Sequence, residues 1–463
     1  MPPLLLYLLT LAPDITWAHN GADGGDLIVA AYSLGVSHPP GYPAYTLLAH
    51  FFTQIPWGSI AWRVNLLSAL GAALAAGAAA LSVAALTEEK PAFERFFGAL
   101  AAAWLLAFSP ALWSQALIAE VYAPHAALIG FSLWLALRLR ARPSPSAALI
   151  LGLLWGISFG FQMISIFLLP LLLWALWRAA AQARFFALGA ALAALQWLYP
   201  ALRAGQGAIT WGSPASLTGW WWLVSGSLYQ GYLFSAPPEI WLPRLLYLLR
   251  ALLLDFGPFS APLAFLGGVV LVRTRPRLAL CLGASAVALI IFALGYNTSD
   301  SNNYLLPVFL FFCVLIGFGL TELWPRVRAR LGRFALPLGS ALFLALILWS
   351  LIVNGPRLSL RAEREAVQFG EKILQSAPPN AVLLTGDDRA TFTLWYFRYV
   401  LHQREDVLVL DQDLLTFDWY RAPLNLSPEQ VSALLAGNGF SPRPLCRVSL
   451  TPEPALTGCS DGY

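Results

Sequence analysis

The sequence predicts an α-helical protein that crosses a membrane many times and carries a small, more polar region at its C-terminal end. Three observations predict this fold class. Hydrophobic residues make up 58% of the 463 residues and charged residues only 11%, whereas a soluble protein carries about 25% charged residues. The mean hydropathy is +0.66. Long apolar runs alternate with short loops, and basic residues collect in every second loop.

About 11 apolar runs could form transmembrane helices, since a helix needs about 20 residues to cross the hydrocarbon layer. The run at 60–86 is rich in small residues, which predicts close packing against a neighbouring helix. Residues 41–55 predict a short helix near the interface, and residues 242–254 fit either a surface helix or a partial span. The runs are residues 1–11, 60–86, 97–112, 122–139, 147–159, 164–177, 185–202, 258–272, 278–294, 304–323 and 334–353.

The first run, at 1–11, is short, but it lacks the basic start and the cleavage site of a signal peptide. We therefore interpret it as the first transmembrane helix of a multi-pass membrane protein.

The loops predict an orientation, because Lys and Arg favour cytoplasmic loops. The N-terminus is expected in the cytoplasm. The first long loop (13–59), the loop at Glu120 and the C-terminal region are expected on the outer side, where the loops hold little beyond Arg203, Arg244 and Arg250. The net charge of +4 reflects the basic loops on the predicted cytoplasmic side, and it does not indicate nucleic-acid binding. The basic loops contain Lys90, Arg95, Arg138, Arg140, Arg142, Arg178, Arg184, Arg273, Arg275, Arg277, Arg326, Arg328, Arg330 and Arg333.

The composition changes after the last apolar run. Two β-like runs, at 381–385 and 406–411, flank a helical stretch at 391–400. This order predicts a small α/β domain, so we divide the chain into a transmembrane domain (1–355) and an extracytoplasmic domain (356–463). Cys446 and Cys459 could form a disulfide there or remain free, and the sequence leaves both open.

The first outer loop combines acidic residues with a rigid backbone. Asp23 and Asp26 precede a stretch that can be helical, with Asp23 at the N-cap and Asp26 three residues later. This spacing fits a capping box. It also fits a general base that takes the proton of an acceptor hydroxyl, or a pair of oxygen ligands for a divalent cation such as Mg²⁺ or Mn²⁺. All three interpretations stay open.

His38 begins the segment His-Pro-Pro-Gly-Tyr-Pro at 38–43, in which three prolines and a glycine fix an abrupt turn. The histidine could satisfy backbone groups of the loop, or donate to a sugar or phosphate oxygen. Irregular backbone beside a bilayer is tolerated where it is buried in protein or lines a wet cavity. We therefore favour a functional role for His38.

Five other residues on the outer side are candidates for binding. Glu120 could pair with an arginine or bind a sugar. Arg63 and Arg203 could extend to lipid headgroups or grip a lipid phosphate. Trp211 is interpreted first as an interfacial anchor and second as a sugar-stacking surface, and Asp300 first as a loop residue and second as a ligand.

These residues also carry a family resemblance. The segments 10–13, 23–27 and 34–43 resemble the signature of a bacterial membrane family of unknown function, which is similar to the animal protein O-mannosyltransferase called transmembrane protein 260. The similarity continues at 63–68, 120–122, 198–203, 211–214, 300–307, 384–387 and 394–396. The family pattern reads Asp-Ser-Gly-Glu where this chain has Asp-Gly-Gly-Asp, so Gly24 replaces serine and Asp26 replaces glutamate. Family members often place a histidine near Gln162, which leaves the role of that position open here.

The resemblance implies a GT-C glycosyltransferase that uses a polyprenyl-phosphate sugar at the outer membrane face. It implies Asp23 as the acidic active-site residue, with Asp26 beside it. The expected reaction transfers mannose or another hexose to a hydroxyl of a protein or glycan acceptor, with inversion. His38, Arg63, Glu120, Tyr122, Arg203, Trp211 and Asp300 would then bind the donor or the acceptor. A transporter or flippase of lipid-linked sugars, or a non-catalytic scaffold, remains the alternative; a transporter is expected to show internal repeats, which the sequence lacks.

Overall fold

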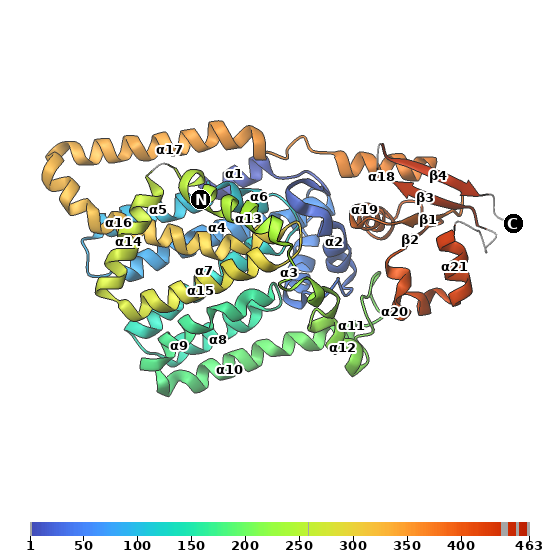
Figure 1. The fold of residues 1–463 in the computed structure, drawn as a ribbon, viewed down its shortest axis with the longest axis horizontal. Coiled ribbons are helices and arrows are strands. Elements are labelled where there is room, and N and C mark those ends of the chain that lie inside the picture. Colours follow the sequence, from blue (N-terminus) through green and yellow to red (C-terminus); the bar gives the residue numbers. More distant parts are fainter. Residues whose placement is uncertain (1, 258, 437–442, 451–452, 461–463) are drawn as a thin grey trace.

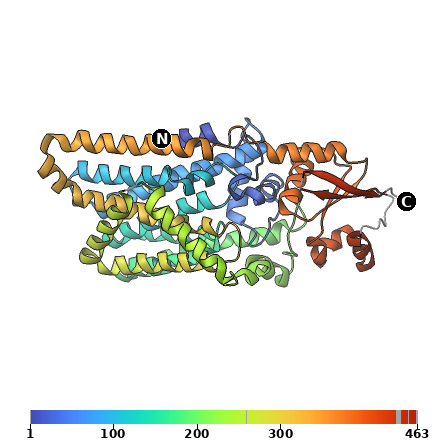
Figure 2. The same cartoon turned by 45° about the horizontal axis from the view of Figure 1, so that its top comes forward.

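The computed structural model describes residues 2–257, 259–436, 443–450 and 453–460. Figure 1 shows an elongated molecule in which long helices run side by side along the main axis, with a small sheet at one end. After a turn of 45° the sheet still lies beyond the ends of the helices (Figure 2). Met1 and Pro258, where two of the predicted spans begin, lie outside the described residues. The fold is mostly helical with a small C-terminal sheet, as the sequence predicts.

The part of the chain up to residue 203 folds into helices of very different lengths. Short 3-10 turns η1 (Ala18–Asp23), η2 (Met163–Leu168), η3 (Ala180–Gln182) and η4 (Leu195–Leu198) lie between the α-helices. The α-helices are α1 (Pro2–Thr10), α2 (Gly24–Ser33), α3 (Pro43–Thr53), α4 (Ile60–Leu86), α5 (Ala92–Ala107), α6 (Pro110–Gln115), α7 (Tyr122–Ala141), α8 (Pro145–Ser158), α9 (Leu169–Arg178), α10 (Ala183–Ala194) and α11 (Tyr199–Arg203).

A second group of helices follows a loop that returns to the start of the chain. They are α12 (Leu217–Val224), η5 (Ser227–Tyr232), α13 (Pro238–Arg250), the π-helical turn η6 (Ala251–Asp255), α14 (Ser260–Thr274), α15 (Pro276–Gly295), η7 (Ser301–Leu305), α16 (Leu306–Leu331), η8 (Gly332–Phe334) and α17 (Ala335–Leu358). Every run predicted to be a span therefore overlaps a helix.

The number of spans stays a prediction. By length and apolar composition, four helical stretches of the described chain could cross a membrane: Ile60–Leu86, Ala180–Arg203, Pro276–Gly295 and Ser301–Leu358. A fifth is added if the bent pair Pro238–Asp255 and Ser260–Thr274 forms one span. The ambiguous stretch at 242–254 thus belongs to a broken helix.

Small residues let α4 pack closely against its neighbours, as predicted. Ser59 caps the helix by accepting a hydrogen bond from the amide of Trp62. A Cβ added at Gly71 would lie 2.7 Å from the backbone of Pro124 in α7. The two helices can approach this closely only because Gly71 has no side chain.

The C-terminal sheet confirms the predicted strand–helix–strand order. Its strands are β1 (Val382–Thr385), β2 (Leu408–Asp411), β3 (Leu445–Ser449) and β4 (Ala455–Ser460), in the order β2-β1-β3-β4. Strand β1 is parallel to both β2 and β3, with Val382 opposite Leu408, and β4 is antiparallel to β3. The helices are α18 (Glu365–Ser376), α19 (Asp388–Tyr399), α20 (Asp418–Arg421) and α21 (Pro428–Ala436), with 3-10 turns η9 (Leu414–Thr416) and η10 (Ala422–Leu424). Parallel strands need such a crossover, and α19 provides it between β1 and β2.

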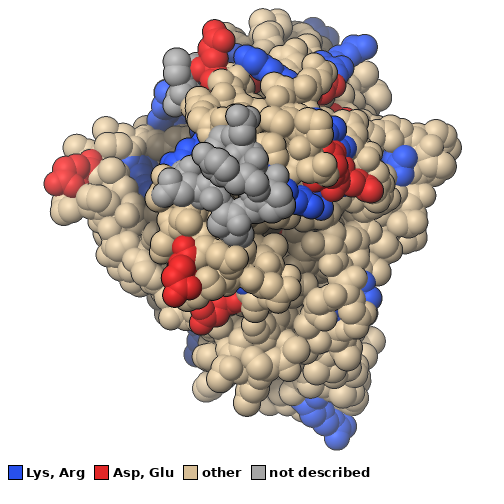
Figure 3. Space-filling view, turned by 90° about the vertical axis from the view of Figure 1, so that its right-hand side faces the viewer, with Lys and Arg blue, Asp and Glu red and all other residues tan. Residues whose placement is uncertain are grey.

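A disulfide joins Cys446 in β3 to Cys459 in β4. The possibility that the sequence left open is therefore realised in the structure, while Cys281 and Cys313 are free. Seen from the end that carries the sheet, charged side chains form small separate groups on a mostly uncharged surface (Figure 3).

The C-terminal part docks through α19 against the segment 13–59, which keeps here the name first outer loop from its predicted orientation. The indole of Trp17 donates to the hydroxyl of Thr393, and the hydroxyl of Tyr396 donates to Asp14. Helix α2 packs directly on α19, since a Cβ added at Gly25 would lie 2.4 Å from the carbonyl oxygen of Phe392. The first outer loop is thus enclosed between the helices and the sheet.

Replacing Gly25 with valine should separate α19 from α2. The new side chain meets a backbone carbonyl, which cannot move without shifting α19, and such overpacking typically costs about 1–3 kcal/mol. We expect a lower melting temperature and faster cleavage by trypsin at Arg361 and Arg364, which precede α18. Gly77→Val is the matched control, because that helical glycine faces open space. Equal resistance of both variants to trypsin would contradict this docking.

Candidate functional site

The first outer loop places its two acidic residues in very different surroundings. Asp23 takes the N-cap position of α2, but its side chain makes no capping hydrogen bond. Asp26, in the first turn of α2, is fully buried. The capping-box interpretation is therefore wrong. The loop folds back over the start of the helix, and its polar groups bind Asp26 instead.

Asp26 accepts three hydrogen bonds that fix the site. One oxygen, Oδ2, accepts from the backbone amide of His38 at 3.0 Å and from Nδ1 of its ring at 2.7 Å. The other, Oδ1, accepts from the indole nitrogen of Trp211 at 2.8 Å. Trp211 is only 4% exposed, so it is not an interfacial anchor. It positions Asp26.

The loop of Trp211 is tied to the first outer loop by the backbone. The amide of Val36 donates to the carbonyl of Ile209 at 3.0 Å, and the amide of Trp211 donates to the carbonyl of Val36 at 3.1 Å. Gly41, with a φ of +89°, and Tyr42, with a φ of 38°, turn the chain sharply before α3. Glycine favours this left-handed region, which explains its place after the two prolines.

His38 connects the two carboxylates. With Nδ1 bound to Asp26, its Nε2 lies 3.7 Å from Oδ2 of Asp23. Burial alone would lower the pKa of His38, but Asp23 and Asp26 together raise it to about 9. The ring is packed edge-on against Tyr42, Tyr229 and Trp211. His38 is therefore a buried imidazolium at neutral pH, held in one orientation.

Asp23 is the accessible carboxylate of this pair. Its side chain is 41% exposed, whereas that of Asp26 is 0% exposed. Desolvation by the surrounding protein raises the pKa of Asp23, His38 lowers it, and Asp300 and Asp26 raise it further. A carboxylate whose pKa is moved toward neutrality, yet which can be reached from solvent, suits proton transfer.

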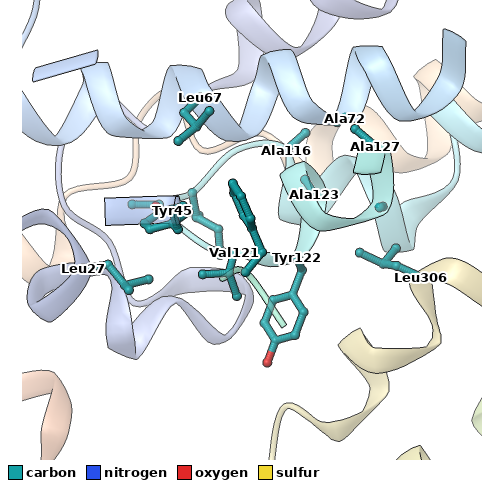
Figure 4. Close-up of a cluster of buried hydrophobic side chains, with 14 of the residues drawn as sticks. Leu27, Tyr45, Leu67, Ala72, Ala116, Val121, Tyr122, Ala123, Ala127 and Leu306 are labelled. Atoms are coloured by element: carbon teal, nitrogen blue, oxygen red, sulfur yellow. The ribbon is translucent and has the colours of Figure 1, made fainter. Parts of the chain in front are cut away.

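A second acidic group lies beside Asp23. Glu120 is 4% exposed, and burial, Asp23 and Asp300 all raise its pKa. Its carboxylate accepts a hydrogen bond from the amide of Val121 at 3.3 Å, and no ion pair with an arginine is found within the described ranges. Asp300 accepts a hydrogen bond from the hydroxyl of Tyr122. Figure 4 shows Tyr122 at the lower edge of a packed apolar cluster, with its hydroxyl directed away from the other labelled side chains.

Two residues of the segment 63–68, which lies in α4, hydrogen-bond to the loops that carry the site. The amide nitrogen of Asn65 donates to the carbonyls of Ala12 and Asp14, which fixes the start of the outer loop. The hydroxyl of Ser68 donates to the carbonyl of Glu120 at 3.1 Å. Sequence reasoning did not assign these roles, although both residues lie in a segment that it singled out.

Asp388 is a residue of the site that the sequence did not reveal. It begins α19, and no role was assigned to it from the sequence. In the structure its pKa is raised to about 7, by burial, Asp23 and Asp411, while His38 opposes this rise. The sheet domain thus contributes a carboxyl group to the electrostatics of Asp23 and His38. The neighbouring motif at 384–387 was the available signal.

The structure does not bring the two candidate arginines to Asp23. Arg63 donates to the carbonyls of Thr53, Trp57 and Gly58, and so closes the turn after α3. Arg203 donates to the carbonyls of Leu34 and Ser33 at the end of α2. Carbonyls at a helix end attract a guanidinium. Phosphate binding by these arginines is therefore a prediction that their placement does not support.

The residues do not fit a divalent cation at Asp23 and Asp26. Both oxygens of Asp26 already accept hydrogen bonds from His38 and Trp211. Within the part of the chain that the structure describes, no group of three or more His, Cys, Asp or Glu side chains is arranged to hold a metal ion. We derive no step through a metal.

The charge of His38 predicts a pH-dependent stability. Its pKa is about 9 in the folded protein and about 6.5 in an unfolded chain. The charge therefore stabilises the folded state fully below about pH 6.5, and this contribution is lost as the pH rises through 9. We expect the melting temperature to fall more between pH 7 and pH 10 in the wild type than in His38→Gln. His402→Gln, at an exposed histidine, should follow the wild type, and identical profiles for all three would contradict the assignment.

Two family models match the chain. The protein O-mannosyl-transferase TMEM260 N-terminal domain matches residues 23–185, and TMEM260-associated domain 2 matches residues 366–433. Both matches are to domains described from TMEM260 proteins, and together they cover 231 of the 463 residues. The first match begins at Asp23 and includes Asp26, His38 and Glu120. The second includes Asp388, so both TMEM260 domains contribute to the site.

Two curated relatives are similar to this chain. The mouse protein O-mannosyl-transferase TMEM260 is 26% identical over 452 residues, covering 90% of this chain and 62% of the mouse protein. The chain thus spans about three fifths of the length of that TMEM260 relative. The Dictyostelium discoideum protein O-mannosyl-transferase tmem260 is 29% identical over 134 residues, covering 28% of this chain and 15% of that protein.

Solved structures share the fold of this chain. ArnT from Cupriavidus metallidurans bound to undecaprenyl phosphate has a TM-score of 0.66 at 14% identity, over 96% of this chain and 92% of ArnT. The oligosaccharyltransferase of Archaeoglobus fulgidus in complex with Zn and sulfate has a TM-score of 0.55 at 13% identity, over 88% of this chain and 61% of that protein. At such identities the likeness shows the GT-C fold expected from the sequence.

Proposed function

We propose that this chain transfers a sugar from a polyprenyl-phosphate donor to an acceptor hydroxyl, with Asp23 as the general base. One observation carries the proposal: Asp23 is accessible beside His38, whose ring is hydrogen-bonded to the buried Asp26. Trp211 in turn donates a hydrogen bond to Asp26. The names of both TMEM260 relatives support sugar transfer to protein. The bound lipid in the ArnT structure, which shares the fold, supports a lipid-phosphate donor.

The proposed reaction is a single displacement. Asp23 takes the proton of the acceptor hydroxyl as its oxygen forms a bond to the anomeric carbon. The bond between that carbon and the phosphate oxygen breaks, and the lipid phosphate leaves with its electron pair. The configuration at the anomeric carbon therefore inverts. His38 stays protonated, and its charge opposes the rise in the pKa of Asp23, which favours the ionised form that accepts the proton.

The docked α19 suggests how the acceptor is placed. Asp388 lies at the start of this helix and interacts electrostatically with Asp23 and His38. We place the acceptor at the exposed side of Asp23, next to the start of α19, where its hydroxyl can meet the carboxylate. The site would lie on the extracytoplasmic face of a bacterial inner membrane, in agreement with the arginine-rich loops at the other end.

The proposal is tested with purified protein in detergent. Polyprenyl-phosphate mannose and a serine- and threonine-containing peptide are supplied, and the glycopeptide is measured by mass spectrometry. NMR of the product should show the anomeric configuration opposite to that of the donor. A nucleotide sugar should not replace the lipid donor. Retained configuration would overturn the single displacement, and lipid translocation in vesicles without transferred sugar would favour a flippase.

A further inference from the structure

A hollow lies toward the end of the molecule opposite to the sheet domain (Figure 1). It has a volume of about 870 Å³ and is enclosed by the ends of α7 and α9 and the start of α15. Helix α9 packs against both α7 and α15. A groove of about 440 Å³ continues from it between α9 and α15. The two share Arg140, Trp174 and Arg277, so they form one continuous depression.

The hollow carries an uncompensated positive charge. Five arginines line it, together with Glu88 and Glu89. Glu88 pairs with Arg142 at 2.7 Å. Arg275 donates to the carbonyl of Leu86 at 2.9 Å. The remaining three are Arg140, Arg178 and Arg277, and none of them forms an ion pair within the described ranges.

The positive charges of Arg178 and Arg277 repel that of Arg140. The guanidinium of Arg140 lies 5.2 Å from the ring centre of Trp174. One of its nitrogens, Nη1, is buried and has no hydrogen-bond partner. A buried donor without an acceptor costs free energy, and an anion in the hollow would satisfy it.

The groove that leads from this charge is apolar. Its walls include Leu173, Trp177 and Leu280, which are 58%, 79% and 73% exposed on the side of the helices. On membrane-spanning helices such side chains face acyl chains rather than water. An anion with an attached hydrocarbon chain therefore matches both parts of the depression.

We propose that this depression binds an anionic phospholipid, with its phosphate on Arg140, Arg178 and Arg277 and one acyl chain in the groove. Guanidinium groups bind phosphate oxygens by paired, charge-assisted hydrogen bonds. Basic pockets between transmembrane helices are suited to such headgroups. The site is distinct from the carboxylate site and does not depend on the proposed sugar transfer.

The test measures lipid binding to the full chain in detergent by native mass spectrometry. Phosphatidylglycerol should bind more tightly than phosphatidylcholine. The double variant Arg140→Gln/Arg277→Gln should bind phosphatidylglycerol about thirty-fold more weakly, because each arginine near a lipid surface contributes about a fivefold factor. Arg328→Gln/Arg330→Gln, at exposed arginines outside the depression, is the matched control and should bind like the wild type.

A second variant tests the groove without touching the arginines. Leu280→Trp fills it at an exposed position, so the fold should be kept, and phosphatidylglycerol binding should weaken about threefold or more. Glycerol phosphate should not compete at the lipid's concentration. Competition by glycerol phosphate would reduce the site to a free-phosphate site. Equal binding of phosphatidylcholine, or no loss in either variant, would overturn the proposal.

Discussion

Replacing Asp23 with asparagine is expected to lower sugar transfer by about 10²- to 10⁴-fold, the usual contribution of a general base. Asparagine keeps the size of the side chain but cannot accept the hydroxyl proton. Donor binding should change little, because the base acts mainly in the transition state, so the loss should appear in kcat rather than in KM. The measurement is initial-rate mass spectrometry of the glycopeptide at saturating polyprenyl-phosphate mannose.

Asp14→Asn is the matched control for this experiment. Asp14 lies in the same loop and accepts hydrogen bonds from Tyr396 and from the amide of Ile15. An asparagine oxygen can accept the same bonds, so transfer should stay close to the wild-type rate. The wild type should lose activity on acidification at a pH above the ordinary pKa of an aspartate, since the pKa of Asp23 is raised. Full activity of Asp23→Asn would remove the proposed base.

Local composition was enough to predict much of the fold. Apolar runs located the helices, and the small residues around Gly71 indicated the close contact that the structure has with Pro124. The β-like runs placed β1 and β2, because short buried strands around a helix have a distinct pattern. The number of spans could not be settled in this way, since helices such as α8 and α9 are shorter than a membrane is thick.

The site was only partly predictable. Asp23, Asp26 and His38 stand out because polar residues in a Gly- and Pro-rich frame are rare in so apolar a chain. Asp23 is exposed and Asp26 is buried, and this difference depends in part on Trp211, which lies far along the chain and donates a hydrogen bond to Asp26. Asp388 reaches the site only through the docking of α19 on α2. Contacts between distant segments carry no local sequence signal.

The two candidate arginines show another limit of sequence reasoning. Arg63 and Arg203 lie at helix ends on the side of the site, and a charge-based argument assigns them to a phosphate. In the structure, backbone carbonyls of nearby turns bind both guanidinium groups. Carbonyl groups at helix ends are left without partners by the chain itself, so a nearby arginine has an internal partner that sequence position alone does not reveal.

Replacing Asp26 with asparagine is expected to have the largest effect on stability. Three donors point at this buried carboxylate, and asparagine offers one oxygen and one amide group, so at least one donor would face another donor. Removing one partner of a buried charge pair costs about 3–5 kcal/mol. The pKa of His38 should also fall, because Asp26 is one of the groups that raise it.

Two measurements separate positioning by Asp26 from a general loss of folding. Trp211→Phe removes one donor and keeps the charge, so it should cost less stability and leave the pH dependence of the melting temperature unchanged. Asp26→Asn should flatten that dependence between pH 7 and pH 10, because Asp26 is one of the groups that raise the pKa of His38. Sugar transfer should fall in kcat as His38 loses its fixed orientation toward Asp23. A destabilised Asp26→Asn protein with an unaltered pH profile would show that Asp26 supports the fold without controlling His38.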